Sequence, residues 1–174
     1  PMLRARDFDQ TRLRLAGIDV DPRQKQQELA SSLRYQVAAL DGMAACHNLQ
    51  VAYVKPHGAL YNDMMVDPVV RAAVMRSVAS YHRPLALMLQ ATPEAEVHRE
   101  EAQQHGLALL FEAFADRCYA DDGRLLSRRL PGAVHDRERM LAQVRQLLDH
   151  GTITTHGGKV LALARRHADA LQHY

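Results

Sequence analysis

A short polar segment that could do chemistry follows the apolar run at residues 51–54. It consists of Lys55, Pro56, His57 and Gly58. Proline biases Lys55 toward an extended backbone, so Lys55 and His57 can project to the same side. A fixed cation beside a group that titrates near neutrality could polarise a carbonyl or phosphoryl oxygen and move a proton. The alternative is a solvated strand-end lysine and a turn histidine bonded to the backbone.

A second polar segment follows the apolar run at residues 107–111. If the chain stays extended there, Glu112, Phe114 and Asp116 share one side. Two carboxylates and the neighbouring Arg117 guanidinium could then point into one cleft. The alternative is a surface pair of Asp116 with Arg117, which contributes little to stability.

Three other segments suggest local structure more than chemistry. Thr92, in the segment 90–93, is placed to cap the following helix, although a helix N-terminus could also hold an anion. Residues 121–123 have the composition of a turn, and His156 lies in the turn of an expected hairpin. The chain contains no P-loop, dinucleotide-binding glycine motif, nucleophile elbow or zinc-protease motif.

The elements that must position these side chains alternate between buried strands and amphipathic helices. We expect strands over residues 51–54, 85–89 and 107–111, helices over residues 22–47, 67–82, 94–105 and 136–150, and a hairpin of residues 152–155 and 159–163. Met140, Leu141, Val144, Leu147 and Leu148 form the expected apolar face of the last helix. This alternation predicts an α/β fold with right-handed βαβ units and a parallel sheet. Ligands of such folds gather beyond the carboxyl ends of the strands, where both polar segments lie.

Composition narrows the class of protein. Lys and Arg total 22 against 20 Asp and Glu, a balance that argues against nucleic-acid binding. Cys46 and Cys118 match neither a zinc ribbon nor a redox pair, so we expect free thiols in a reducing compartment. Neither a signal-peptide core nor an apolar stretch of ~20 residues is present. We therefore expect a cytoplasmic protein.

Three sequence blocks resemble those of one protein family. The run VKPHGALYN at residues 54–62 strongly resembles the signature of the LamB/YcsF family. The runs EAFADRCY at 112–119 and SRRLPGAV at 127–134 resemble further blocks of that family, in the same order. The resemblance extends from about residue 19 to residue 163.

The resemblance implies a fold and an activity. The implied fold is a seven-stranded β/α barrel of the glycoside hydrolase and deacetylase superfamily, present here as one partial domain over residues 1–174. The implied function is that of one component of ATP-dependent 5-oxoprolinase, which opens the lactam of 5-oxo-L-proline to L-glutamate with partner subunits B and C. Two alternatives remain: a metal-dependent carbohydrate deacetylase-like hydrolase, and a scaffold without catalysis.

The resemblance also suggests roles for individual residues. Lys55 and Arg117 would neutralise developing negative charge, since phosphorylation of the carbonyl oxygen is a reasonable way to activate a stable lactam. Proton transfer would fall to one or more of three further residues: His57, Glu112 or Asp116. Gly58 and Tyr61 would bind substrate, Tyr61 through its hydroxyl group.

The chain departs from the family pattern at both ends. Family members begin with a strand carrying an Asp-x-Asn-x-Asp run and carry a His-Gly-Asp run after the hairpin, and neither occurs here. We therefore expect that Leu163 and Ala164 are not bonded neighbours in the native protein, with a further junction within residues 4–15. Ligands for a divalent metal would lie in the absent segments. If the sequence is complete, exposed strand edges would favour a homo-oligomer.

Overall fold

The structure is a computed structural model that describes residues 22–163. Both expected junctions, at 163/164 and within 4–15, lie outside the described residues. The described chain forms two compact units, one of residues 22–88 with 101–109 and the other of residues 89–100 with 110–163.

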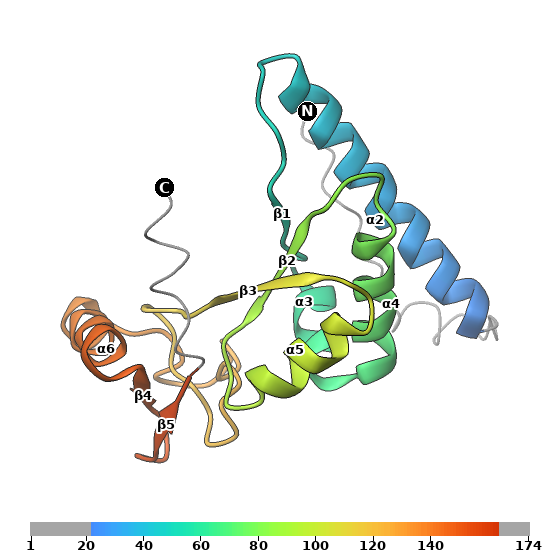
Figure 1. Ribbon diagram of the computed structural model, residues 1–174. Coiled ribbons are helices and arrows are strands. Elements are labelled where there is room, and N and C mark those ends of the chain that lie inside the picture. The colour runs from blue at the N-terminus through green and yellow to red at the C-terminus, as the bar shows by residue number, and fades with distance from the viewer. Residues whose placement is uncertain (1–21, 164–174) are drawn as a thin grey trace. The chain divides into compact units, whose positions relative to one another are not determined.

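The first unit is built around two long helices. Helix α2 (Pro22–Ala45) packs against α4 (Pro68–Ala79), as Figure 1 shows. Leu33 is buried, and Ser77 Oγ donates a 3.1 Å hydrogen bond from α4 to the carbonyl of Ala30 on α2. Both helices were expected, over residues 22–47 and 67–82, and both are confirmed.

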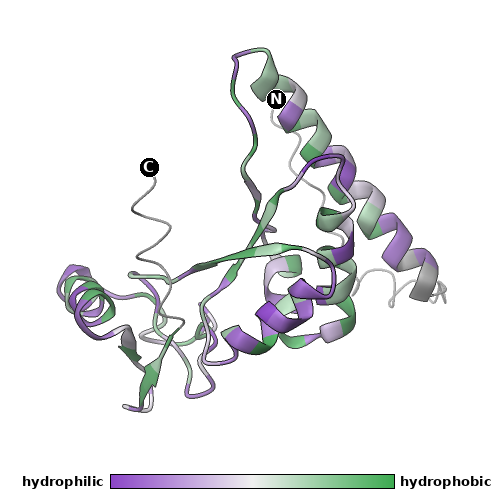
Figure 2. Cartoon of the chain, in the orientation of Figure 1, coloured by the Kyte–Doolittle hydropathy of each residue, from purple (hydrophilic) through white to green (hydrophobic). Residues whose placement is uncertain are grey.

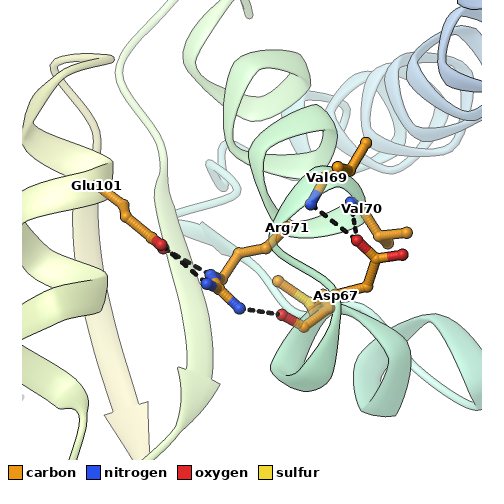
Figure 3. A network of polar contacts seen from close by, with 6 residues as sticks. Asp67, Val69, Val70, Arg71 and Glu101 are labelled. Carbon is orange, nitrogen blue, oxygen red and sulfur yellow. Dashed lines mark hydrogen bonds and ion pairs between the residues drawn. The ribbon is translucent and has the colours of Figure 1, made fainter.

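Capping explains where α4 begins. The Asp67 carboxylate accepts hydrogen bonds from the backbone N–H groups of Val69 and Val70, at 2.8 and 3.3 Å (Figure 3). Proline occupies the first helical position. It has no backbone N–H group, so no donor is left without a partner there. The short helix α3 (Ala59–Val66), which ends against this cap, was not predicted from the sequence.

The sheet has the strand order β1-β2-β3, with β1 at Tyr53–Val54, β2 at Ala86–Gln90 and β3 at Ala108–Glu112. Strands β1 and β2 run parallel, with Val54 opposite Leu87. Figure 2 shows β2 and β3 as predominantly hydrophobic, and Leu87 and Leu89 are fully buried. The predicted α/β fold with a parallel sheet is confirmed.

The second unit contains helix α6 (Arg137–His150) and a hairpin of β4 (Thr152–Thr154) and β5 (Val160–Ala162). Asp136 caps α6 by accepting from the N–H group of Arg139 at 2.9 Å. The hairpin strands are antiparallel, with Ile153 fully buried opposite Leu161, so the expected hairpin is confirmed.

Helix α5 (Ala95–Gln103) lies between β2 and β3 in the chain. It confirms the helix expected over residues 94–105. None of the helices in residues 22–163 is both long and apolar enough to span a membrane.

Candidate functional site

The segment after β1 brings Lys55 close to the first turn of α3. Lys55 Nζ lies 6.0 Å from the ring centroid of Tyr61, at the outer limit of a cation–π contact. The Tyr61 side chain is buried and Lys55 is half-buried, whereas His57 is exposed. The structure therefore places Lys55 and Tyr61 together, with His57 on the adjoining surface of the same unit.

Gly58 makes this turn possible. It is the N-cap residue of α3, with φ 66° and ψ −138°, a backbone conformation that side-chain-bearing residues rarely adopt. Its carbonyl accepts a 3.3 Å bond from the Asn62 side-chain amide. The glycine thus allows the chain to pass directly from Lys55 into the helix that carries Tyr61.

In the second unit, Glu112 is the last residue of β3 and is half-buried. Its carbonyl accepts a 2.8 Å bond from the N–H group of Ala91, which follows β2. The hydroxyl oxygen of buried Tyr119 accepts a 2.9 Å bond from the N–H group of Phe114. Burial raises the pKa of Tyr119 to about 12, and the negative charge of Glu112 acts in the same direction. A carboxylate and a neutral phenol therefore share this environment.

The chain does not stay extended after Glu112. Ala115 and Asp116 form a turn, so the expectation that Glu112, Phe114 and Asp116 share one side is wrong. The turn is formed because the backbone groups of these residues bond to a later segment of the chain instead of to a strand. Asp116 is exposed on it.

Arg117 is buried, with an exposed fraction of 7%. Its Nη2 donates to the carbonyl of Leu126 at 2.6 Å, and its Nε donates to the carbonyl of Ala133 at 3.2 Å. Burial lowers the pKa of the guanidinium. The alternative of a surface pair with Asp116 is therefore wrong, because the Arg117 side chain points inward to hold the segment 117–135.

Two residues to which the sequence reasoning gave no role hold the turn after β3. Gln143 Nε2 lies 2.7, 3.2 and 2.8 Å from the carbonyl oxygens of Phe114, Ala115 and Arg117. His135 lies beside it, with Nε2 3.2 Å from Gln143 Oε1. A signal was present: Gln143 is a polar residue among apolar ones at helical spacing. Gln143 is buried, and two members of the expected apolar face, Leu141 and Leu148, are exposed.

The remaining polar segments are structural. Within residues 22–163, the buried hydroxyl of Thr92 has no hydrogen-bond partner, so the expectation that it caps α5 is wrong. Residues 121–123 form the expected turn, and Asp121 accepts a 3.1 Å bond from the backbone N–H group of Gly157. His156 is a turn residue, as expected, and its N–H group donates to the carbonyl of Tyr119 at 2.7 Å.

The predicted site residues thus fall into two groups. Lys55, His57, Gly58 and Tyr61 belong to the first unit. The others, Glu112, Asp116 and Arg117, belong to the second. Within residues 22–163, no three His, Cys, Asp or Glu side chains converge in a way that could hold a metal ion.

The sequence profile of the LamB/YcsF family matches residues 22–170, which include all three blocks and both groups of site residues. The chain belongs to the LamB/YcsF family. The signature run of this LamB/YcsF chain is therefore the segment that carries Lys55 and leads through Gly58 into α3.

Curated relatives of this LamB/YcsF chain are named as A subunits of 5-oxoprolinase. The chain is 48% identical over 141 residues to such a protein of Pseudomonas putida, a match that covers 80% of this chain and 55% of the relative. It is 46% identical over 138 residues to another of Pseudomonas fluorescens, covering 79% and 55%. The chain thus spans about half the length of the curated relatives it matches.

A solved structure matches a comparable share of this chain. The lactam utilization protein from Thermus thermophilus matches with a TM-score of 0.70 and 28% sequence identity. The match covers 80% of this LamB/YcsF chain and 56% of that protein. The two proteins share their fold over this region.

Proposed function

We propose that this chain is part of the A subunit of a 5-oxoprolinase, which opens 5-oxo-L-proline to L-glutamate with partner subunits B and C while ATP is hydrolysed. The observation that carries the proposal is the 48% identity to a relative of that name over 80% of the chain. The cytoplasm, where such a substrate and ATP are both available, is the proposed location.

The proposed complete fold is the seven-stranded β/α barrel. Strands β1, β2 and β3 alternate with helices α3, α4 and α5, as consecutive units of such a barrel would. The solved lactam utilization protein is longer, since only 56% of it is matched. The remaining strands would correspond to its unmatched part.

The chemistry requires activation of an unreactive amide. Transfer of the γ-phosphoryl group of ATP to the lactam oxygen would give ADP and a phosphorylated imidate. Water would then add to the ring carbon, and cleavage of the ring C–N bond, with a proton delivered to the nitrogen, would open the ring and leave an acyl phosphate. A second water would hydrolyse this acyl phosphate to L-glutamate and phosphate. Lys55 and Arg117 would stabilise negative charge on the oxygen and the phosphoryl group, because positive charges in a partly buried site act strongly. The bonds of the Arg117 guanidinium go to main-chain carbonyls, so Arg117 would contribute its positive charge and no direct hydrogen bond to the substrate.

Proton transfers would fall to three residues. His57 is exposed and can exchange protons with water, and Glu112 and Asp116 are carboxylates after β3. Gly58 would let the backbone approach the substrate, and Tyr61 would orient it.

The test uses the full-length protein reconstituted with its partner subunits and measures glutamate and ADP formed from 5-oxoproline and ATP. We expect Lys55→Ala to lower kcat by about 100-fold, the usual loss when one group that stabilises an oxyanion is removed. Lys159→Ala is the matched control, because Lys159 is an exposed lysine on the hairpin and should leave kcat unchanged. A wild-type complex that forms no glutamate would overturn the proposed function. Normal turnover by Lys55→Ala would overturn only the role of Lys55.

A further inference from the structure

Four consecutive carbonyl groups in the turn after β3 are held by one later segment of the chain. Gln143 Nε2 contacts the carbonyl oxygens of Phe114, Ala115 and Arg117 at 2.7, 3.2 and 2.8 Å. The carbonyl of Asp116 accepts a 2.9 Å bond from the N–H group of His135. An amide nitrogen has two hydrogens, so the 3.2 Å contact shares one of them. Every carbonyl of residues 114–117 is therefore bonded to residues 135–143.

The orientation of the Gln143 amide is itself fixed. Its Oε1 can only accept, so the 3.2 Å contact with His135 Nε2 requires the hydrogen to be on that nitrogen. His135 Nδ1 is buried and has no hydrogen-bond partner among the residues that the structure describes. Within the described chain, this imidazole makes one hydrogen bond through a ring nitrogen. That bond holds Gln143 Oε1 and thus directs the NH₂ group of Gln143 toward the turn.

Backbone N–H groups on either side of the turn are held as well. The backbone N–H group of Phe114 donates to the Tyr119 hydroxyl, and that of Cys118 donates to the carbonyl of Ala133 at 3.0 Å. Among residues 114–118, Asp116 has the one exposed side chain. A backbone held at so many points fixes the position of the Asp116 Cα–Cβ bond, from which the carboxylate projects.

We propose that Gln143 is a positioning residue: together with His135, it fixes residues 114–117 so that the Asp116 carboxylate is presented to the substrate. This inference rests on the proposed function and deepens it, because it assigns to α6 the placement of one acid–base group. Gln143 itself touches no reacting atom.

The test compares Gln143→Ala with Gln146→Ala in the reconstituted full-length complex. Gln146 is a matched control, since it lies one turn further along α6 and bonds to Thr152 and Thr154 of the hairpin instead of the turn. We expect Gln143→Ala to lower kcat by about 10- to 100-fold with little change in KM, as small displacements of a catalytic group do. Gln146→Ala should stay within about twofold of wild type.

A double-mutant cycle separates positioning from general destabilisation. In an Asp116→Asn background, Gln143→Ala should cause no further loss of kcat, because the group that it positions is already absent. Hydrogen exchange of the peptide covering residues 114–118 should speed up in Gln143→Ala and not in Gln146→Ala. His135→Leu, which keeps Gln143 but releases its amide, should change both readouts in the same direction and by less.

The outcomes are distinct. With an active wild type, normal kcat in Gln143→Ala, or a full and additive loss in the Asp116→Asn background, would overturn the positioning role. If Gln143→Ala does not fold, His135→Leu decides by the same two criteria. A wild-type complex that opens no lactam would instead overturn the proposed function, and with it the catalytic meaning of the network.

Discussion

The side-chain nitrogen of Gln143 lies 2.8 Å from the carbonyl oxygen of Arg117, while the guanidinium of Arg117 reaches on to the carbonyls of Leu126 and Ala133. Arg117 is therefore held through its main chain by α6, and its side chain in turn holds the irregular segment that leads to α6. The side chains of Gln143 and Arg117 therefore hold the shape of the second family block, residues 112–119.

Removal of the Arg117 side chain should destabilise the second unit. The carbonyl of Leu126 would lose the guanidinium in a buried setting, whereas that of Ala133 would keep its bond from Cys118. We expect Arg117→Ala to lower the free energy of unfolding by about 2 kcal/mol, measured by urea denaturation. Arg117→Lys should recover only part, since an ammonium group lacks the planar fork. Arg128→Ala, an exposed change nearby, should shift stability by less than about 0.5 kcal/mol, and an equal effect of both alanine variants would contradict this account.

A side chain at position 58 should strain the turn between Lys55 and α3. The φ of 66° and ψ of −138° at Gly58 cost other residues about 1–3 kcal/mol, so we expect Gly58→Ala to lower stability by that amount and to reduce activity. Gly42→Ala is the control. A Cβ atom there, within α2, would meet nothing within 4 Å, and the change should raise stability by about 0.5–1 kcal/mol. Unchanged stability in Gly58→Ala would show that the turn relaxes.

Asp41 should make the first unit sensitive to acid. Hydrogen bonds from Arg83, reinforced by the Tyr81 hydroxyl, lower the pKa of Asp41 from 3.8 to about 2. Because the folded-state pKa lies below the unfolded one, the ionised group stabilises the fold above about pH 4, and this contribution is lost as the pH falls from about 4 to 2. Asp41→Asn should reduce the change in the free energy of unfolding over that pH interval, measured by urea denaturation at several pH values. The same slope in the wild type and in Asp41→Asn would refute the role of Asp41.

The ion pair of Arg71 and Glu101 should stabilise the first unit as a pair. Arg71 Nε and Nη2 lie 2.6 and 2.8 Å from the two carboxylate oxygens, and Nη1 donates to the carbonyl of Met64 at 3.0 Å (Figure 3). Glu101 is partly exposed, so breaking the pair with Arg71→Met should cost about 2–3 kcal/mol, less than in a fully buried site. The double variant Arg71→Met with Glu101→Met should regain part of the stability that Arg71→Met loses, as measured by thermal denaturation. Additive losses would show that the two side chains act independently.

The sequence predicted the elements of the fold well where local patterns decide them. The apolar runs that became β2 and β3, and the Asp-Pro pairs at residues 21–22 and 67–68, are signals that lie within a few neighbouring residues. Burial was less predictable, since Ala108 of β3 is exposed. Helix α3 was missed because its start depends on an unusual backbone conformation at Gly58, and no local rule predicts that conformation for a given glycine.

The polar residues that follow the strands could be found from the sequence, but the groups that surround them in the fold were only partly predictable. The placement of Lys55 beside Tyr61 follows from a turn of a few residues. The burial of Arg117 depends on carbonyl groups up to 16 residues away, and the shape of the 114–117 turn depends on Gln143, 26 residues beyond Arg117.

Sequence by itself determined the family, the alternation of strands and helices, and the residue types available for chemistry. These depend on short-range patterns and on residue identity. Tertiary structure alone decided which polar side chains face inward and which backbone groups they satisfy. Buried polar groups must find partners wherever the folded chain supplies them, and those partners lie far apart in the sequence.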